Sequence, residues 1–91
     1  MPLVGFAFTT AALKYLATLP PKLRKQVTRK ARALQNDPHP QGSKKLHGET
    51  TATGEPIYRE RSGDYRILYV VRNNPTEVIV LDIDDRKDVY R

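Results

Sequence analysis

The sequence predicts an α+β domain in which a two-helix hairpin packs on a mostly antiparallel sheet, in the order β-α-α-β-β-β. Apolar residues recur with helical spacing between residues 9 and 35. Three β-branched, apolar runs separated by turn residues follow between residues 57 and 83. The 91 residues suit a single domain, residues 1–91, with one modest hydrophobic core.

The first strand and the first helix are expected near the N-terminus. Residues 3–8 are apolar enough for a strand, and Thr9 or Thr10 can cap a helix by accepting hydrogen bonds from free backbone N–H groups. Pro20 and Pro21 end this helix, because proline lacks the N–H that a helix interior needs. Pro21 also suits the first turn of a following helix.

The second helix is expected from about residue 21 to residue 35. Its apolar face has spacings of four, four and three, and is made by Leu23, Val27, Ala31 and Leu34. The opposite face is basic and carries Lys22, Lys25, Arg29 and Arg32. Such a face is either a solvated surface or a surface that binds phosphates, and the pattern leaves both interpretations open.

The rest of the chain is predicted as a long loop followed by three strands. Residues 36–56 are rich in proline and glycine, which break regular structure, and a loop of this length in a small domain is often functional. The strands are expected at residues 57–62, 65–72 and 77–83. Residues 84–91 form a charged tail.

Three arginines gather in the hairpin that the first two of these strands form. If Gly63 and Asp64 form a two-residue turn, Arg61 pairs with Arg66 across the strands, and alternation puts Arg59 on the same face. A four-residue loop would keep this pairing, whereas a three-residue loop would destroy it. Like charges directly opposite each other are destabilising. A sequence shaped by stability alone should avoid this pairing.

Three explanations for these arginines compete. The side chains splay into water, or they pair with acids of this chain, for which the candidates are Glu60, Asp64, Asp82 and Asp84. The third explanation is a phosphate-bearing ligand, since planar forked donors fit phosphate well. Glu60 is expected on the other face of its strand, which weakens its claim as a partner.

Composition restricts the chemistry and the partners. Sixteen Lys and Arg against ten Asp and Glu give a net charge of +6, which indicates either a polyanionic partner or a solubility device. The absence of cysteine excludes disulfides and thiolate metal sites and fits the cytosol. With two histidines and no thiol, we expect any chemistry to need neither a metal nor a cofactor. Lys14 interrupts the pattern of a signal peptide, and no apolar stretch approaches the roughly 20 residues that span a membrane.

Three segments, "KKLHG", "YRERSGDYRILYVV" and "VIVLDIDDRKDVYR", together resemble the RelE/ParE superfamily of toxins from bacterial and archaeal type II toxin–antitoxin pairs. The resemblance covers roughly the second half of the chain. It implies a small α+β fold and a cognate antitoxin that wraps and neutralises the toxin. For RelE-like members it implies ribosome-dependent, metal-independent cleavage of messenger RNA in the cytoplasm, in which a 2′-hydroxyl attacks the adjacent phosphate and translation is inhibited.

Carried over position by position, the resemblance implies a catalytic set of Arg59, Arg61, Arg66, Arg86 and Tyr90. Arg61 and Arg66 stand where relatives hold and stabilise the phosphate. Tyr90 matches a tyrosine near the C-terminus that orients or stacks on the substrate, and Arg86 matches a basic position before it. A second, RNA-binding set comprises Lys25, Arg29, Arg32, Lys44, Lys45 and Arg91. These side chains would contact phosphates of ribosomal RNA, which carry no sequence information.

Two departures from the family pattern leave the general base unidentified. Arg59 replaces a lysine proposed as the base, and arginine is a poor proton acceptor because a guanidinium gives up its proton only in strongly alkaline solution. Asp84, Asp85 and Arg86 stand where many relatives have Gly-His-Arg.

Other members of the superfamily provide two alternatives for the function. In the first alternative, the chain is a ParE-like protein that inhibits DNA gyrase by binding and cuts no nucleic acid. In the second, it is a degenerate, non-toxic member of the superfamily. In either toxin branch we expect a hetero-oligomer with an antitoxin whose binding segment is acidic or amphipathic. The ribosome and messenger RNA are expected as partners of the RelE-like branch, and no membrane is expected.

Overall fold

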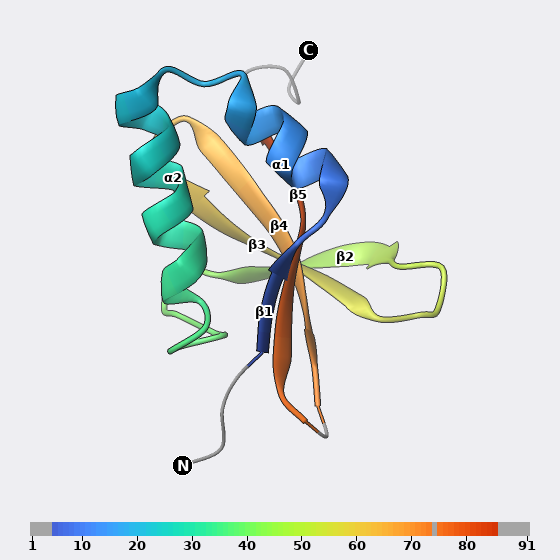
Figure 1. Cartoon of the computed structure of the whole chain (residues 1–91). Helices are drawn as coiled ribbons and strands as arrows, with labels where there is room; N and C mark the ends of the chain where they lie inside the picture. The colour runs from blue at the N-terminus through green and yellow to red at the C-terminus, as the bar shows by residue number, and fades with distance from the viewer. Residues whose placement is uncertain (1–4, 74, 86–91) are drawn as a thin grey trace.

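The computed structural model describes residues 5–73 and 75–85. Along the chain its elements are β1 (Gly5–Phe8), α1 (Thr10–Ala17), α2 (Pro21–Ala33), β2 (Lys44–Thr50), β3 (Pro56–Ser62), β4 (Tyr65–Arg72) and β5 (Glu77–Asp85). The sheet order is β1-β5-β4-β3-β2, in which β1 runs parallel to β5 and the other neighbours are antiparallel. The predicted fold class is confirmed, because a helical hairpin packs on a mostly antiparallel sheet (Figure 1).

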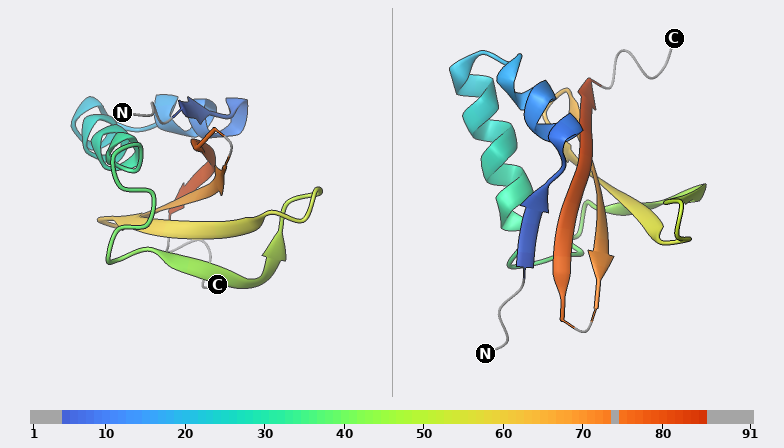
Figure 2. Two further views of the ribbon diagram at one scale, coloured as in Figure 1. Left: turned by 90° about the horizontal axis from the view of Figure 1, so that it is seen from below. Right: turned by 45° about the vertical axis from the view of Figure 1, so that its right-hand side comes forward.

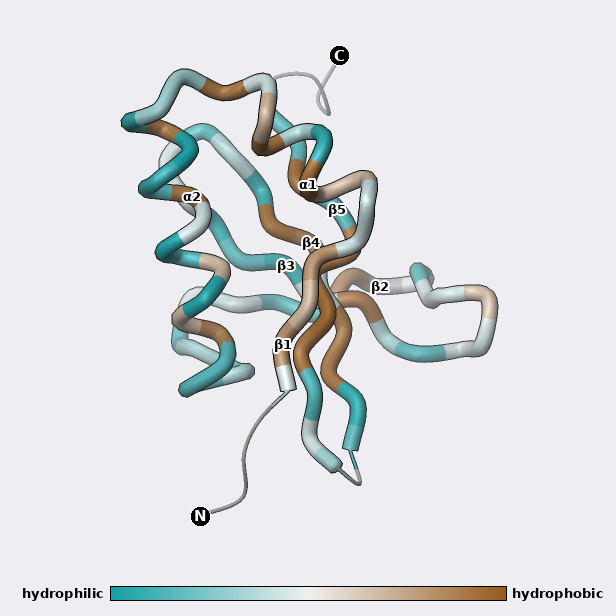
Figure 3. The backbone as a smooth tube through the Cα atoms, in the orientation of Figure 1, coloured by the Kyte–Doolittle hydropathy of each residue, from teal (hydrophilic) through white to brown (hydrophobic). Residues whose placement is uncertain are grey.

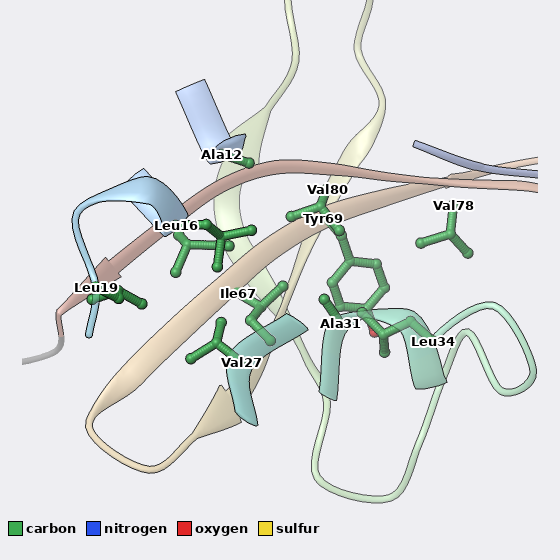
Figure 4. Packing of buried hydrophobic residues seen from close by; sticks show 11 residues of the cluster. Ala12, Leu16, Leu19, Val27, Ala31, Leu34, Ile67, Tyr69, Val78 and Val80 are labelled. Carbon is green, nitrogen blue, oxygen red and sulfur yellow. The ribbon is translucent and has the colours of Figure 1, made fainter. Parts of the chain in front are cut away.

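Both helices cover the same face of the sheet, and the hydrophobic core lies between the two layers (Figure 2). Figure 4 shows Val27 and Ala31 of α2 close to Ile67 and Tyr69 of β4. Alternate residues of β4 therefore face the helices, as the period of a strand requires. The buried apolar residues of this core are Ala12, Leu16, Leu19, Val27, Ala31, Leu34, Ile67, Tyr69, Val78, Val80 and Ile83.

The helix boundaries follow the capping and proline signals of the sequence. The Thr9 hydroxyl oxygen accepts a hydrogen bond from the backbone N–H of Ala12 at 3.2 Å, so Thr9 is the cap of α1. Proline occupies the first position of α2, where its missing N–H has no helical partner to lose. On the predicted apolar face of α2, Val27, Ala31 and Leu34 are buried and Leu23 is partly buried.

The long loop predicted for residues 36–56 is wrong in its middle, because residues 44–50 form the edge strand β2. β2 pairs with β3 through Lys44 opposite Arg59 and Lys45 opposite Tyr58, and its register then shifts before Thr50 meets Pro56. The strand is polar and mostly exposed. An edge strand with few buried side chains shows no apolar alternation, so the sequence pattern did not reveal it.

A β-bulge in β5 changes the register halfway along its pairing with β4. Tyr69 lies opposite Val80, whereas Leu68 lies opposite Asp82, so Leu81 is the extra residue on β5. The hydroxyl of the α1 cap residue donates to the Leu81 carbonyl. The bulge is therefore tied to the start of α1, and every residue of β5 beyond it is displaced by one position relative to β4.

Hydropathy follows the layers of the fold. The central parts of β4 and β5 are hydrophobic, while α2 alternates between hydrophilic and hydrophobic stretches (Figure 3). Within residues 5–73 and 75–85, no helix is long and apolar enough to cross a membrane.

Candidate phosphate-binding site

The hairpin between β3 and β4 has the register expected from its turn. Ser62 lies opposite Tyr65, and Arg61 lies opposite Arg66. The turn contains Gly63 with φ of 60°, a left-handed conformation that glycine adopts without the steric penalty of a side chain. The two arginines therefore sit side by side on neighbouring strands, as the sequence predicted.

These arginines lie on the face of the sheet turned away from α1 and α2, which we call the far face. On β4 the side chains of Ile67 and Tyr69 enter the core between sheet and helices, so the alternating residue Arg66 projects from the far face. On β3 the buried Glu60 faces α2, so Arg59 and Arg61 on either side of it also project from the far face.

Arg66 forms an ion pair with Asp84, which stands opposite it on β5. Its Nε and Nη2 atoms each lie 3.2 Å from one carboxylate oxygen of Asp84. The side chains are 13% and 29% exposed, so the pair is partly shielded from water. For Arg66, the second of the three explanations is therefore confirmed: it pairs with an acid of this chain. Of the four candidate acids, that partner is Asp84.

Arg59 and Arg61 differ from Arg66 in this respect. Within the described ranges, neither guanidinium has a carboxylate at ion-pair distance. Arg61 is exposed and Arg59 is half-buried. The carboxylate of Glu60 accepts a hydrogen bond at 3.0 Å from the backbone N–H of Arg61, not from its guanidinium. The expectation that Glu60 faces away from the arginines is confirmed.

Strand β2 adds lysine to the far face. Lys44 lies directly opposite Arg59, so a second pair of like charges borders the first. A shallow depression of about 470 Å³ lies here and is lined by Lys44, Lys45, Leu46 and Arg59. The sequence predicts a loop for the two lysines, whereas strand β2 brings both to the depression beside Arg59. The segment that forms β2 is polar, so its sequence shows no apolar alternation that would predict a strand.

The basic face of α2 is a separate surface on the opposite side of the sheet (Figure 2). A groove of about 400 Å³ along it is lined by Arg24, Lys25, Thr28, Arg29 and Arg32. Arg32 is partly engaged, since its guanidinium carbon lies 5.8 Å from the ring centre of Phe6. The structure therefore divides the predicted RNA-binding residues between two elements, with Lys25, Arg29 and Arg32 on α2 and Lys44 and Lys45 on β2. Within β2, Lys44 shares the face of Arg59, and Lys45 lies opposite Tyr58 on the other face.

The predicted residues Arg86, Tyr90 and Arg91 lie outside the described residues, and their roles stay predictions. For residues 5–73 and 75–85, no group of three or more His, Cys, Asp or Glu side chains is arranged to hold a metal ion.

At the other end of β4, a second ion pair joins Arg72 to Glu55 and was not expected from the sequence. Arg72 Nε lies 2.7 Å from one Glu55 oxygen, and Nη2 lies 3.1 Å from the other. Glu77 approaches the same guanidinium at 3.9 Å. Hydrogen bonds from Arg72 and then from Thr53 lower the pKa of Glu55 to about 2.

Comparison with known proteins relates this arrangement to a family of toxins. Residues 6–90 match the family described as "ParE toxin of type II toxin-antitoxin system, parDE". The chain is 36% identical to Toxin RelG of Mycobacterium tuberculosis (strain ATCC 25618 / H37Rv), with 92% of each chain covered.

Solved structures give the same result. The toxin–antitoxin complex RelBE2 of Mycobacterium tuberculosis matches with a TM-score of 0.74 and 30% identity, over 94% of each chain. The archaeal RelE-RelB complex of Pyrococcus horikoshii OT3 matches with a TM-score of 0.75 and 24% identity, over 92% of this chain and 96% of that one. At 24% identity, the likeness to the Pyrococcus horikoshii complex shows a shared fold.

Proposed function

The chain belongs to the RelE/ParE superfamily of type II toxin–antitoxin toxins, on its RelE-like side, and we propose that this toxin cleaves messenger RNA on the ribosome without a metal ion. The observation that carries the proposal is the far face of the sheet. There the strand register brings Arg61 beside Arg66 and Arg59 beside Lys44. Four cations on neighbouring strands form a surface suited to a phosphate backbone.

The proposed reaction transfers the phosphate within the RNA. The 2′-oxygen of one nucleotide bonds to the adjacent phosphorus while the bond from phosphorus to the 5′-oxygen breaks. The products are a 2′,3′-cyclic phosphate and a 5′-hydroxyl, so the proton lost from the 2′-hydroxyl is balanced by one gained at the leaving oxygen. Negative charge accumulates on the phosphoryl oxygens in the transition state, and preorganised guanidiniums aimed at that charge lower the barrier.

Within this proposal Arg61 and Arg66 hold the phosphate and Arg59 adds positive charge beside it. Tyr90 orients or stacks on the substrate, and Arg86 supplies a further cation. Arg59 does not act as the base, because a guanidinium is a poor proton acceptor. The basic face of α2, with Lys25, Arg29 and Arg32, contacts phosphates of ribosomal RNA away from the reaction.

The partners follow from the same membership. Solved relatives were determined as complexes of RelE with RelB, and we propose that this toxin is neutralised in the cytoplasm by a cognate antitoxin in a hetero-oligomer. An acidic or amphipathic antitoxin segment complements the net charge of +6. Residues 1–91 then act as one toxin domain, with no cofactor.

A ParE-like inhibitor of DNA gyrase is the second candidate. The family description that matches residues 6–90 is that of ParE toxins, and the ion pair with Asp84 neutralises one arginine of the proposed site. Both observations would suit a toxin that binds a protein target and cuts nothing.

Induction of the toxin followed by primer extension separates the two candidates. We expect new 5′ ends in translated messengers, no new ends in a messenger whose start codon is mutated, and the same cuts on programmed ribosomes when the toxin has been treated with EDTA and dialysed beforehand. Arg61→Ala should abolish most of these cuts. Loss of gyrase supercoiling activity with intact messengers would show that the second candidate is right.

A further inference from the structure

We propose that Asp84 is a positioning residue for Arg66: its carboxylate occupies the Nε/Nη2 edge of the guanidinium and leaves the terminal Nη1/Nη2 edge to a phosphate. The inference rests on the proposed function, since the phosphate is that of the RNA. It assigns a role to an acid that lies within a basic site and that would otherwise weaken anion binding.

The geometry of the ion pair carries the first step. Asp84 uses the N–H of Nε and one N–H of Nη2, each at 3.2 Å. An arginine has five N–H donors in a fixed plane. Among the described residues, only Asp84 accepts hydrogen bonds from the Arg66 guanidinium, so the second N–H of Nη2 and both on Nη1, at the end of the side chain, have no partner in this part of the chain. This end is itself a fork that matches two phosphate oxygens.

The surroundings of the pair carry the second step. The register places Arg61, Arg66 and Asp84 in one row across β3, β4 and β5. Arg66 thus has a like charge on one side and an opposite charge on the other, which offsets the repulsion between the two arginines. With 13% of its side chain exposed, Arg66 has little freedom to leave this row.

The neighbouring acids do not duplicate Asp84. Asp82 is on the same face, one row away, opposite Leu68. One of its carboxylate oxygens accepts a hydrogen bond from the Ile83 backbone N–H at 2.8 Å. Asp85 lies opposite Tyr65, a residue that packs against the core on the helix side. Among the described acids, Asp84 is the one that forms an ion pair with Arg66.

The β-bulge explains why Asp84 stands there. Before the bulge, Arg72 pairs with Glu77 and Tyr69 with Val80; continued without interruption, that register would put Ile83 opposite Arg66. The extra residue Leu81 shifts β5 by one and brings Asp84 to that position instead. Bulges often re-aim a side chain beside an active site.

The first test does not depend on catalysis. The full chain, released from its antitoxin and refolded, is titrated with an RNA trinucleotide whose 2′-oxygen is methylated at the cleavage point. The probe is followed through the Arg66 Nε–H signal by NMR. We expect the signal to stay sharp and protected when the trinucleotide binds, because Asp84 keeps its edge while the phosphate takes the other. If the bound signal instead becomes as exposed as in Asp84→Asn, the phosphate displaces Asp84 and the inference is wrong.

The second test uses turnover on programmed ribosomes with two matched variants. Asp84→Asn should lower kcat about ten- to hundredfold, the scale of losing an outer-shell partner, while KM stays equal or falls because a negative charge is gone. Asp82→Asn removes the same charge from the same face without touching Arg66, and its kcat should match the wild type. Equal losses in both variants, or no loss in either, would overturn the inference.

The two tests also keep this inference apart from the proposed function. A wild-type protein that cuts no messenger but keeps the Arg66 Nε–H signal protected in its complex with the trinucleotide would refute messenger cleavage and support the positioning of Arg66 toward phosphate. A protein that cuts messengers while its Arg66 Nε–H signal becomes as exposed in the complex as in Asp84→Asn would support cleavage and refute the positioning.

Discussion

Arg66 and Arg72 lie on the far face of the same strand, each paired side-on with a carboxylate, yet the two pairs differ in their surroundings. The guanidinium of Arg72 contacts Glu55 and approaches Glu77, while Thr51 and Thr53 donate to the same Glu55. Arg66 has Asp84 on one side and a second arginine on the other.

This difference separates a structural ion pair from a candidate site. Around Arg72, negative charge exceeds positive charge, so no further anion is attracted. Around Arg66, the row of two arginines and one aspartate keeps a net positive charge, and one edge of the guanidinium is available. The neighbours of an ion pair, rather than the pair itself, therefore decide whether it can receive a phosphate.

The largest expected effect is a difference in cleavage rate between variants of Arg66 and Arg72. Arg66→Ala should lower cleavage on programmed ribosomes by about 10² or more, because a preorganised transition-state donor is lost. Arg72→Ala, the matched control on the same strand, should leave cleavage near the wild-type rate. Single-turnover cleavage assays measure both.

Thermal melting of the same two variants shows whether a loss of cleavage comes from a loss of folding stability. Arg66→Ala should lower the melting temperature by no more than about 5 °C, the shift for an ion pair worth about 1 kcal/mol. Should Arg66→Ala melt far lower while its folded fraction cuts normally, Arg66 would be structural and the contrast with Arg72 would disappear.

The arginine neighbour of Arg66 could be predicted from the sequence. The Gly-Asp turn fixed the register of β3 and β4, so the pairing of Arg61 with Arg66 was predicted correctly. Taken alone, that pairing predicts that Arg66→Ala leaves the fold intact or even stabilises it slightly, because a like-charge repulsion is relieved. The ion pair with Asp84 reverses this expectation to a small loss.

The sequence offered Asp84 only as one of four candidate acids for the arginines and did not suggest Glu55 for Arg72, because both choices depend on long-range pairing. Asp84 reaches Arg66 through a bulge whose carbonyl is bound by a threonine 72 positions away in the sequence. Glu55 reaches Arg72 from a segment expected to be a loop. Edge strands and bulges leave little periodic signal in a sequence. The features that the sequence did not predict therefore lie next to the candidate site.

A smaller effect is expected on the basic face of α2, which shares the positive charge but not the strand register. Replacing Lys25, Arg29 and Arg32 together with glutamine should reduce the slope of log affinity for ribosomes against log salt by about 2 to 3, because each lost phosphate contact releases less than one counterion. Binding measured by filtration or sedimentation between low and moderate salt gives this slope. Cleavage by the bound toxin should persist, and an unchanged slope would show that this face is only solvated.

The smallest effect concerns the pH dependence of the Arg72 pair. The pKa of Glu55 is about 2 in the folded protein, below its ordinary value of 4.5, chiefly because Arg72 donates to its carboxylate. A lowered folded pKa means that the stabilisation is present above pH 4.5 and disappears as the pH falls toward 2. Thermal melts of the wild type and Glu55→Gln should therefore differ slightly at pH 6 and converge near pH 2. Glu49→Gln, an exposed control on β2, should follow the wild type throughout. A difference between wild type and Glu55→Gln that stays constant down to pH 2 would mean that the amide disrupts packing, and that the pair at this end of β4 is not held by charge.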